Sequence, residues 1–511
     1  MKARLMFPAR DFDPEAQPPA GIADLVQDLE MESLFAAMAD GDKFLGEIAH
    51  KVVLTGFRND RDTIRHRQDV LDDCIAHENL IRTLYELAMA PLEVLRKNLF
   101  FGLTSRHPEI TLSGAVRLLQ GLRGVIGQLA DFATHHAETF RASGLRRLCA
   151  VLMRELDSDY LAMVDQHLAQ LHFRSGVLFS ASLGPGNKGQ DYVLRHFVPR
   201  RWGWLKDLLQ SGPPSYHFAI DPRDEAGGRA LSELRDEALA ETAQTMAQVC
   251  DHILDFFAML RAELGFYIGC LNLRAHLATK RAPMCQPEIA PPGEQWLEFT
   301  DLRDPCLSLA IEGEVVGNDC AADHAAFVMI TGANQGGKST FLRSIGLAQM
   351  MMQAGMFVTA RRFSADLRDG VFTHYHRRED PGLNSGKFDE ELRRMNRIVD
   401  RAGRAPLFLF NESFAATNER EGSEIARQIV TALIETGARV IFVTHMYAFA
   451  EAYMKTNKVT VRFLRAEREA DGRRSFRILP GEPLSTSFGR DLYRQIFGED
   501  GNDPQSMGIA P

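Results

Sequence analysis

The chain has 511 residues, of which 45% are hydrophobic and 25% charged, and its net charge is −9. This length exceeds what one hydrophobic core usually serves, so we expect two or more domains. The composition excludes a disordered chain, and no apolar stretch approaches the ~20 residues that cross a bilayer. The negative charge argues against a surface that is basic all over, but a local basic groove for nucleic acid remains compatible with it.

The N-terminus has no continuous apolar core that would direct export. The cysteines are odd in number and none forms a C-x-x-C pair, which favours free thiols over a disulfide framework; they lie at positions 74, 149, 250, 270, 285, 306 and 320. We therefore expect a cytoplasmic protein without membrane contact.

Residues 1–20 are rich in Pro and Asp and are predicted to form a loose N-terminal arm, followed by a helical region over 21–285. The clearest helix shows apolar residues at spacings of three and four: Leu239, Thr242, Met246, Val249, Ile253, Phe256 and Leu260. A single helix from about Arg229 to Leu277 would be a strut roughly 70 Å long. The alternative is two ordinary helices broken near Gly265.

The helical region is interrupted at 179–209, where glycines at 184, 186 and 189 predict a turn between two short apolar runs. Basic residues interleaved with Trp202 and Trp204 suit contact with a phosphate backbone, and the candidate DNA-contacting residues are Lys188, Arg195, Arg200, Arg201 and Lys206. The alternative is an amphipathic helix whose tryptophans are core residues and whose arginines are only solvated.

A Pro-rich joint at 283–292 separates the helical region from a segment of different character, 286–498. Apolar β-type runs at 325–331, 407–410 and 439–444 alternate there with helical patterns. This alternation predicts a largely parallel sheet with helices on its faces. Residues 499–511 are predicted to be a flexible tail.

A phosphate-binding loop occupies 332–339, between the first of these strands and a helix. Its glycines let backbone N–H groups cradle phosphates, Lys338 would reach the β and γ oxygens, and Ser339 would offer a hydroxyl to magnesium. The sequence therefore predicts binding of ATP and Mg²⁺, with these nucleotide-binding residues: Gly332, Asn334, Gly336, Gly337, Lys338, Ser339 and Thr340.

Two further strand ends carry candidate catalytic groups. The second strand ends in Asn411-Glu412, where related ATPases usually deliver an Asp towards magnesium. Asn411 is thus a weak metal ligand beside Ser339, and Glu412 is a candidate general base. The third strand ends in Thr444-His445, which places His445 to sense the γ-phosphate, although a loop histidine without a role is the alternative.

The H-x-H segment around His374 and His376 invites a metal-site interpretation, but two histidines are too few for structural zinc. We expect these residues to line the nucleotide site or a dimer interface instead.

Six segments in order resemble the MutS family of DNA-binding ATPases, relatives of the ABC-type ATPases. They are Asp304-Pro305 with 316–319, the phosphate loop TGANQGGKST, GMFVTA at 355–360, LNSGKF at 383–388 with Glu391, NESFAATNEREG at 411–422, and SFG at 487–489. The resemblance implies a mixed fold, an all-α core and lever region followed by an α/β ABC-type P-loop ATPase domain. It also implies a clamp insertion near 179–209.

In such a family two subunits sandwich two nucleotides, and the signature segment, here with Ser385, acts in trans on the partner's ATP. The chain departs from the family pattern in leaving no room before residue 21 for mismatch-reading and connector domains, and in lacking most of the C-terminal dimer-clasping helices. We therefore expect a homodimer whose formation depends on ATP, and no base-mismatch reading.

The leading hypothesis is a MutS-related ATPase, a dimeric nucleotide-gated clamp on DNA that acts in DNA repair or recombination. The alternative is a nucleotide-controlled scaffold that recruits protein partners with little or no ATP hydrolysis. Asn411 favours the scaffold and Glu412 opposes it. A transporter ATPase subunit is a remote third, because those proteins carry no helical half of this size.

Overall fold

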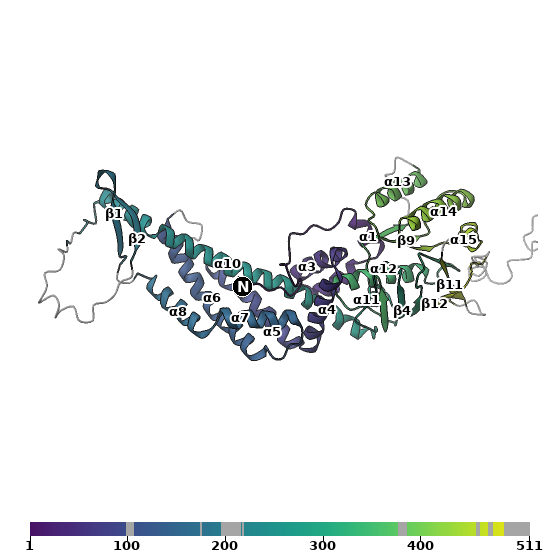
Figure 1. The fold of residues 1–511 in the computed structure, drawn as a ribbon, viewed down its shortest axis with the longest axis horizontal. Coiled ribbons are helices and arrows are strands. Elements are labelled where there is room, and N and C mark those ends of the chain that lie inside the picture. The colour runs from purple at the N-terminus through teal and green to yellow at the C-terminus, as the bar shows by residue number, and fades with distance from the viewer. Residues whose placement is uncertain are drawn as a thin grey trace, which may run out of the picture. The chain divides into compact units, whose positions relative to one another are not determined.

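The computed structural model describes residues 1–98, 107–173, 176–195, 216, 219–376, 386–455, 460–468 and 474–484. They form two compact units: the first comprises residues 1–3, 79–141 and 145–261, and the second comprises 4–78, 142–144 and 262 onward (Figure 1). No helix in the described ranges is long and apolar enough to cross a membrane. The domain boundaries at 20, 285 and 498 remain predictions, and the predicted tail lies outside the described residues.

The first unit is helical and carries one small hairpin. Its helices are α5 (Glu78–Asn98), α6 (Pro108–His136), α7 (Ser143–Glu155), α8 (Ser158–Gln170) and the first part of α10 (Glu225–Thr279). The hairpin pairs β1 (Phe179–Leu183) with β2 (Gly189–Leu194) in antiparallel fashion around a short 3₁₀ turn, Pro185–Asn187. The turn predicted at the glycines is therefore confirmed. The candidate residues Arg200, Arg201 and Lys206 lie outside the described residues.

Helix α10 is continuous over 55 residues, so the single long helix is confirmed and the break near Gly265 is not present. The predicted seam is right at Leu239, Phe256 and Leu260, which are buried, but wrong at Val249, which is 38% exposed. Cys250 is buried in its place. A straight helix of 3.6 residues per turn drifts relative to a heptad, and this drift moves the buried face by one residue.

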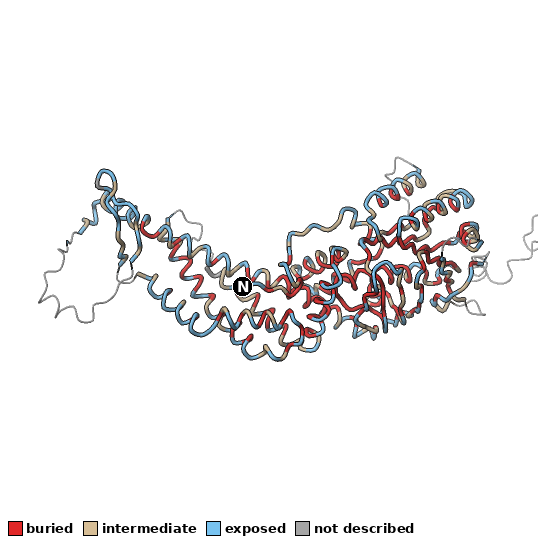
Figure 2. Tube along the Cα trace, viewed as in Figure 1, coloured by how far each residue is buried: buried red, intermediate tan, exposed pale blue. Residues whose placement is uncertain are grey.

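The second unit contains a six-stranded sheet in the order β12-β11-β6-β10-β9-β8. The five strands from β11 to β8 are parallel, and β12 is antiparallel at one edge. In chain order they are β6 (Phe327–Thr331), β8 (Val371–Tyr375), β9 (Leu407–Asn411), β10 (Arg439–Val443), β11 (Val461–Arg468) and β12 (Arg474–Pro480). The three predicted strands are β6, β9 and β10. Their residues form a largely buried layer (Figure 2).

A smaller sheet of four strands has the order β3-β7-β4-β5; its strands are β3 (Glu288–Ile289), β4 (Leu297–Leu302), β5 (Asn318–Ala321) and β7 (Arg362–Ala365). The helices of the second unit begin with α1 (Ile22–Asp28), α2 (Glu32–Ala39), α3 (Lys43–Leu54), η1 (Gly56–Arg58) and α4 (Arg61–Ala76). Those that accompany the sheets are α11 (Pro305–Ala310), α12 (Lys338–Ala354), α13 (Lys387–Val399), α14 (Glu419–Glu435) and α15 (Tyr447–Met454). The chain is therefore mixed α/β, as predicted.

The first residues do not form the loose arm expected from the sequence. Leu5 and Met6 are fully buried, and their backbone N–H groups donate to the carboxylate of Glu263 on α10. Arg67 of α4 donates to Met6 O at 3.0 Å and to Ala354 O, at the end of α12, at 3.1 Å. Backbone donors and acceptors this deep need partners, and these buried charged groups supply them.

Burial raises the pKa of Glu263 to about 6, although three backbone N–H groups act against the rise. Between the ordinary pKa of 4.5 and this value, the folded chain holds a proton that the unfolded chain releases. The contribution of Glu263 to stability is therefore greatest below pH 4.5 and is lost as the pH rises through 6. From pH 4 to pH 7, wild type should lose about 2 kcal/mol more free energy of unfolding than Glu263→Gln, as measured by denaturant titration.

The exposed Glu241 of the same helix supplies the control, because Glu241→Gln should follow wild type at each pH. Parallel stability curves for wild type and Glu263→Gln would show that the carboxylate does not titrate as its burial requires.

Candidate functional site

The loop between β6 and α12 has backbone angles and close contacts that require glycine at several positions. Gly332 has φ 113° and Gly337 has φ 84°, in the region that favours glycine. A Cβ at Gly332 would lie 2.9 Å from the backbone nitrogen of Ala466, and one at Gly336 would lie 2.8 Å from the Ala466 Cβ. Strand β11 therefore packs directly on the loop, and the glycines are required by this close approach as well as by the turn.

Lys338 opens α12, and its side chain folds back over the loop. The ammonium group donates to Gly332 O at 3.0 Å and to Ala333 O at 2.9 Å, and the residue is only 5% exposed. Burial lowers the pKa of Lys338, while the charge of Glu412 acts in the opposite direction. A desolvated cation held at the N-terminus of a helix is a strong site for an anion such as a polyphosphate.

Ser339 follows, and its hydroxyl donates to Asn411 Oδ1 at 3.0 Å. Asn411 is the last residue of β9, so this contact connects the loop to the sheet. The hydroxyl and amide oxygens are hard oxygen donors, the type that Mg²⁺ prefers. The two predicted metal ligands are therefore brought together, although neither of them carries a charge.

Glu412 and His445 meet beside the loop, at the ends of the neighbouring strands β9 and β10. The Nδ1 of His445 lies 3.8 Å from Glu412 Oε1, an ionic contact longer than a direct hydrogen bond. The interaction with His445 lowers the pKa of Glu412, with further help from Lys338 and against the effect of burial. The same contact raises the pKa of His445. Glu412 is thus held as a carboxylate, the state that a general base needs.

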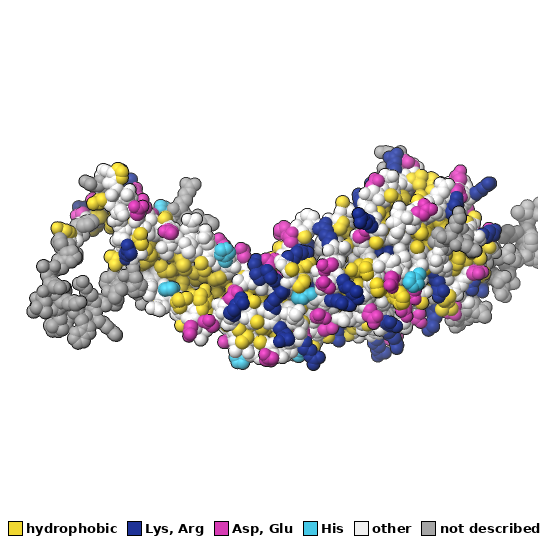
Figure 3. Space-filling view, in the orientation of Figure 1, with side chains coloured by type: hydrophobic (Ala, Val, Ile, Leu, Met, Phe, Trp, Pro, Cys, Tyr) yellow, Lys and Arg dark blue, Asp and Glu magenta, His cyan; other side chains and the backbone are white. Residues whose placement is uncertain are grey.

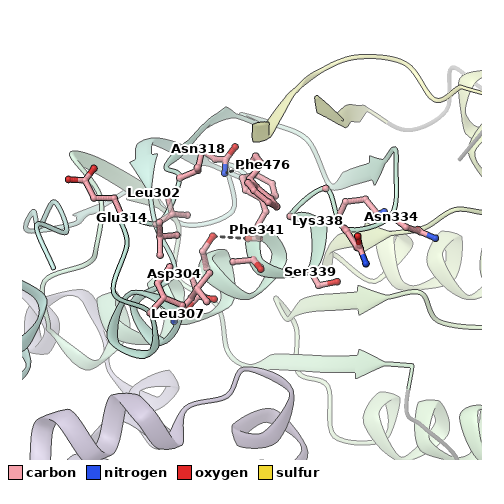
Figure 4. Close-up of a pocket in the computed structure, with 18 of the residues that line it drawn as sticks. Leu302, Asp304, Leu307, Glu314, Asn318, Asn334, Lys338, Ser339, Phe341 and Phe476 are labelled. Carbon is pink, nitrogen blue, oxygen red and sulfur yellow. Dashed lines mark hydrogen bonds between the residues drawn. The ribbon is translucent and has the colours of Figure 1, made fainter. Parts of the chain in front are cut away.

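A cavity of about 590 Å³ opens from this loop (Figure 4). One part is lined by the backbone and side chains of residues 334–340 together with Glu412. The other part is lined by seven apolar residues, Leu302, Leu307, Ile311, Val315, Val316, Phe341 and Phe476, together with the polar residues Asp304, Glu314, Asn318 and Ser344. Such a cavity suits a ligand with a flat, weakly polar ring at one end and phosphates at the other.

The apolar part depends on a contact between distant segments. Asn318 of β5 accepts the Ile478 N–H at 2.7 Å and donates to Phe476 O at 3.3 Å, so its amide holds β12 against the cavity. Phe476 was not among the predicted site residues. Nothing local in SFRILP marks it, because its position is set by this pairing across the fold.

Comparison with known proteins agrees with this geometry. The family described as "MutS2 N-terminal domain" matches residues 59–280, and the family described as "MutS domain V" matches residues 328–493. The chain belongs to the MutS family. The resemblance inferred from its motifs is confirmed.

Three relatives illustrate the match. "DNA mismatch repair protein MutS" from Thermotoga sp. (strain RQ2) is 32% identical over 31% of this chain and 20% of its own length. "Endonuclease MutS2" from Lacticaseibacillus casei (strain BL23) is 28% identical over 49% of the chain and 32% of its own length. "DNA mismatch repair protein MutS" from Chlorobium phaeovibrioides (strain DSM 265 / 1930) is 31% identical over 45% and 27%. The aligned part is thus a fifth to a third of each relative.

In this MutS-family chain, the predicted nucleotide-binding residues line the cavity, except Gly332, whose carbonyl instead accepts from Lys338. The roles assigned to these residues remain predictions, and Ser385 lies outside the described residues. Lys188 and Arg195 are exposed on the β1–β2 hairpin, where Arg195 donates to Ser180 Oγ at 2.9 Å. No group of three metal-binding side chains occurs in the described part of the chain.

Proposed function

We propose that this MutS-family chain binds and hydrolyses ATP and that it binds DNA as a nucleotide-gated dimer. The observation that carries the proposal is the single cavity that joins a glycine-lined phosphate loop, a buried lysine, and a carboxylate paired with a histidine. The relatives named as DNA mismatch repair proteins support DNA as the partner.

The residues present fit ATP with Mg²⁺. The loop amides and Lys338 would hold the phosphates, and the apolar wall with Phe476 would take the base. Mg²⁺ would be held by Ser339 and Asn411, and when bound it neutralises charge that develops on the phosphates. Glu412 would orient the attacking water and accept its proton, and His445, which lies beside that carboxylate, would keep it ionised.

Asn411 is the observation that favours the second candidate, a nucleotide-controlled scaffold. An amide oxygen brings no negative charge to the cation, so Mg²⁺ binding is weaker than with a carboxylate. The intact pair of Glu412 and His445 favours hydrolysis over the scaffold role.

The dimer and its clamp action complete the proposal. Two copies would close around two nucleotides, with Ser385 reaching the partner's phosphate, and the helical unit would contact DNA. One face of the molecule carries cationic and anionic side chains interspersed (Figure 3). A DNA contact is therefore local, and we assign it to the hairpin that exposes Lys188 and Arg195.

Lys338→Met should weaken ATP binding about 10- to 100-fold, the value of one lost charge-assisted hydrogen bond to phosphate. Methionine keeps most of the apolar stem of this buried side chain, so the fold should persist. Equilibrium titration with a fluorescent ATP analogue measures the change. The exposed Lys455 gives the control, because Lys455→Ala should bind ATP like wild type. Equal affinity in Lys338→Met and wild type would rule out this site.

Glu412→Gln should slow hydrolysis at least ~100-fold with ATP affinity preserved, because it removes the base but not the phosphate contacts.

Asn411→Asp should lower the magnesium concentration needed for half-maximal hydrolysis, because it adds a charge to the metal site. The hydrolysis rates of Glu412→Gln and Asn411→Asp are both measured by phosphate release across a magnesium titration. Asn79→Asp, an exposed change of the same chemistry, should leave the magnesium requirement unchanged. Inactive wild type together with inactive Asn411→Asp would favour the scaffold.

DNA binding should weaken steeply with salt and should not prefer a mismatched base pair, because Lys188 and Arg195 offer charges to phosphates rather than a readout of bases. The double variant Lys188→Ala/Arg195→Ala should have a lower affinity than wild type for DNA, and the affinity should fall by the same factor for matched and mismatched duplexes. Its salt slope should be smaller by about 2, one for each lost phosphate contact. Fluorescence anisotropy at several salt concentrations tests this, with the exposed Lys43→Ala as control. A preference above about tenfold for the mismatched duplex would contradict base-independent binding.

A further inference from the structure

A second histidine lies at the catalytic edge of the sheet, and no role has yet been assigned to it. Strand β8 pairs with β9 so that Tyr375 faces Asn411, and the N–H of His376 continues the ladder by donating to Asn411 O at 2.9 Å. His376 and Glu412 are the residues that follow this Tyr375–Asn411 pair, so they leave the two strands side by side. In agreement, the charge of His376 is among the influences that lower the pKa of Glu412, after those of His445 and Lys338.

His376 is held by a buried carboxylate. Its Nδ1 lies 3.2 Å from Glu391 Oε1, on the first turns of α13, and the Glu391 side chain is 10% exposed against 33% for the histidine. Burial raises the pKa of Glu391, and His376 and Lys387 act against that rise. A buried carboxylate is costly without a hydrogen-bonding partner, so this contact fixes the orientation of the His376 ring.

The same helix residue also supports the backbone that carries Glu412. The Nε2 of His374 lies 3.1 Å from Glu391 O, and its Nδ1 lies 2.8 Å from Ser413 Oγ. The His374 ring stacks on Phe414 with centroids 5.3 Å apart. Glu412 and Phe414 both have positive φ, at 53° and 65°, a conformation that persists only where the surroundings enforce it.

Helix α13 is in turn anchored to β8 one turn further on. Arg394 donates to Tyr375 O at 3.0 Å and to Thr373 O at 3.3 Å, and it forms an ion pair with Asp28 of α1 at 2.6 Å. The spacing of three residues places Glu391 and Arg394 on one face of α13. Both side chains therefore contact the end of β8, which holds α13 in place at the Glu391–His376 contact.

We propose that Glu391 and His376 are positioning residues for the catalytic carboxylate: Glu391 orients the His376 ring, and the ring, beside Glu412 at the ends of the paired strands β8 and β9, fixes the place of that carboxylate. This inference rests on the ATP hydrolysis proposed above. Besides His376, the charged groups that act on Glu391 or Glu412 are Lys387 from α13, Lys338 from α12 and His445 after β10. A metal role for His374 and His376 is not supported, because His374 is committed to Ser413 and Glu391.

The test compares Glu391→Gln and His376→Gln with wild type in the full-length protein. The rate of single-turnover ATP hydrolysis is measured for each protein, and ATP affinity is measured by titration with a fluorescent analogue. Both variants should lower the hydrolysis rate about tenfold, with affinity changed less than about twofold, because only the placement of the base is lost.

Glu390→Gln is the matched control, since Glu390 is the adjacent residue of the same helix and makes no contact with His376 among the described residues. A hydrolysis rate of Glu391→Gln equal to that of Glu390→Gln would overturn the inference. So would loss of ATP binding, which would indicate a structural role. A wild type that binds ATP without hydrolysing it would also overturn the inference but leave the nucleotide site standing, whereas a wild type that binds no ATP would refute the proposed function itself.

Discussion

The register of four parallel strands is the constraint on which the rest of the site depends. Val443 of β10 pairs with Ile330 of β6 and also with Asn411 of β9, which in turn faces Tyr375 of β8. Because parallel strands in register end at one edge, the residues that follow them emerge together. A slip of one residue in β9 would turn Asn411 and every other side chain of that strand to the opposite face of the sheet.

An aromatic core holds this register in place. Phe410 of β9 stacks on Phe442 of β10 with ring centroids 5.0 Å apart, and Phe327 of β6 meets Tyr453 of α15 at 4.7 Å. These rings are close to fully buried, so moving a strand would expose large apolar surface or force rings to overlap. The positions of the polar residues at the sheet edge are thus fixed, because the interior behind them is tightly packed.

The buried charged groups at that edge lower the folding stability but prepare the site to bind a charged ligand. Lys338 is desolvated and donates to two backbone carbonyls, and Glu412 is kept charged in a partly buried position. Such arrangements cost folding free energy and are found where a ligand of opposite charge is to be received. At the far end of the same helix, Arg67 binds the carbonyl of Ala354 and joins α12 to the N-terminal segment that Glu263 anchors on α10. A charged side chain therefore binds backbone carbonyls at each end of α12: Lys338 at its start and Arg67 at its end.

Local patterns in the sequence were enough to predict the phosphate loop, the strands β6, β9 and β10, and the continuous α10, because glycine spacing, apolar runs and helical periodicity are properties of neighbouring residues. They were also enough to place Asn411, Glu412 and His445 at one edge, since parallel strands leave few alternatives. Only the tertiary structure decided that Leu5 and Met6 are buried, that Phe476 closes the cavity through Asn318, and that Glu391 holds His376. Each of these depends on side chains that are distant along the chain and meet only when the sheets and helices pack, so no local pattern records them.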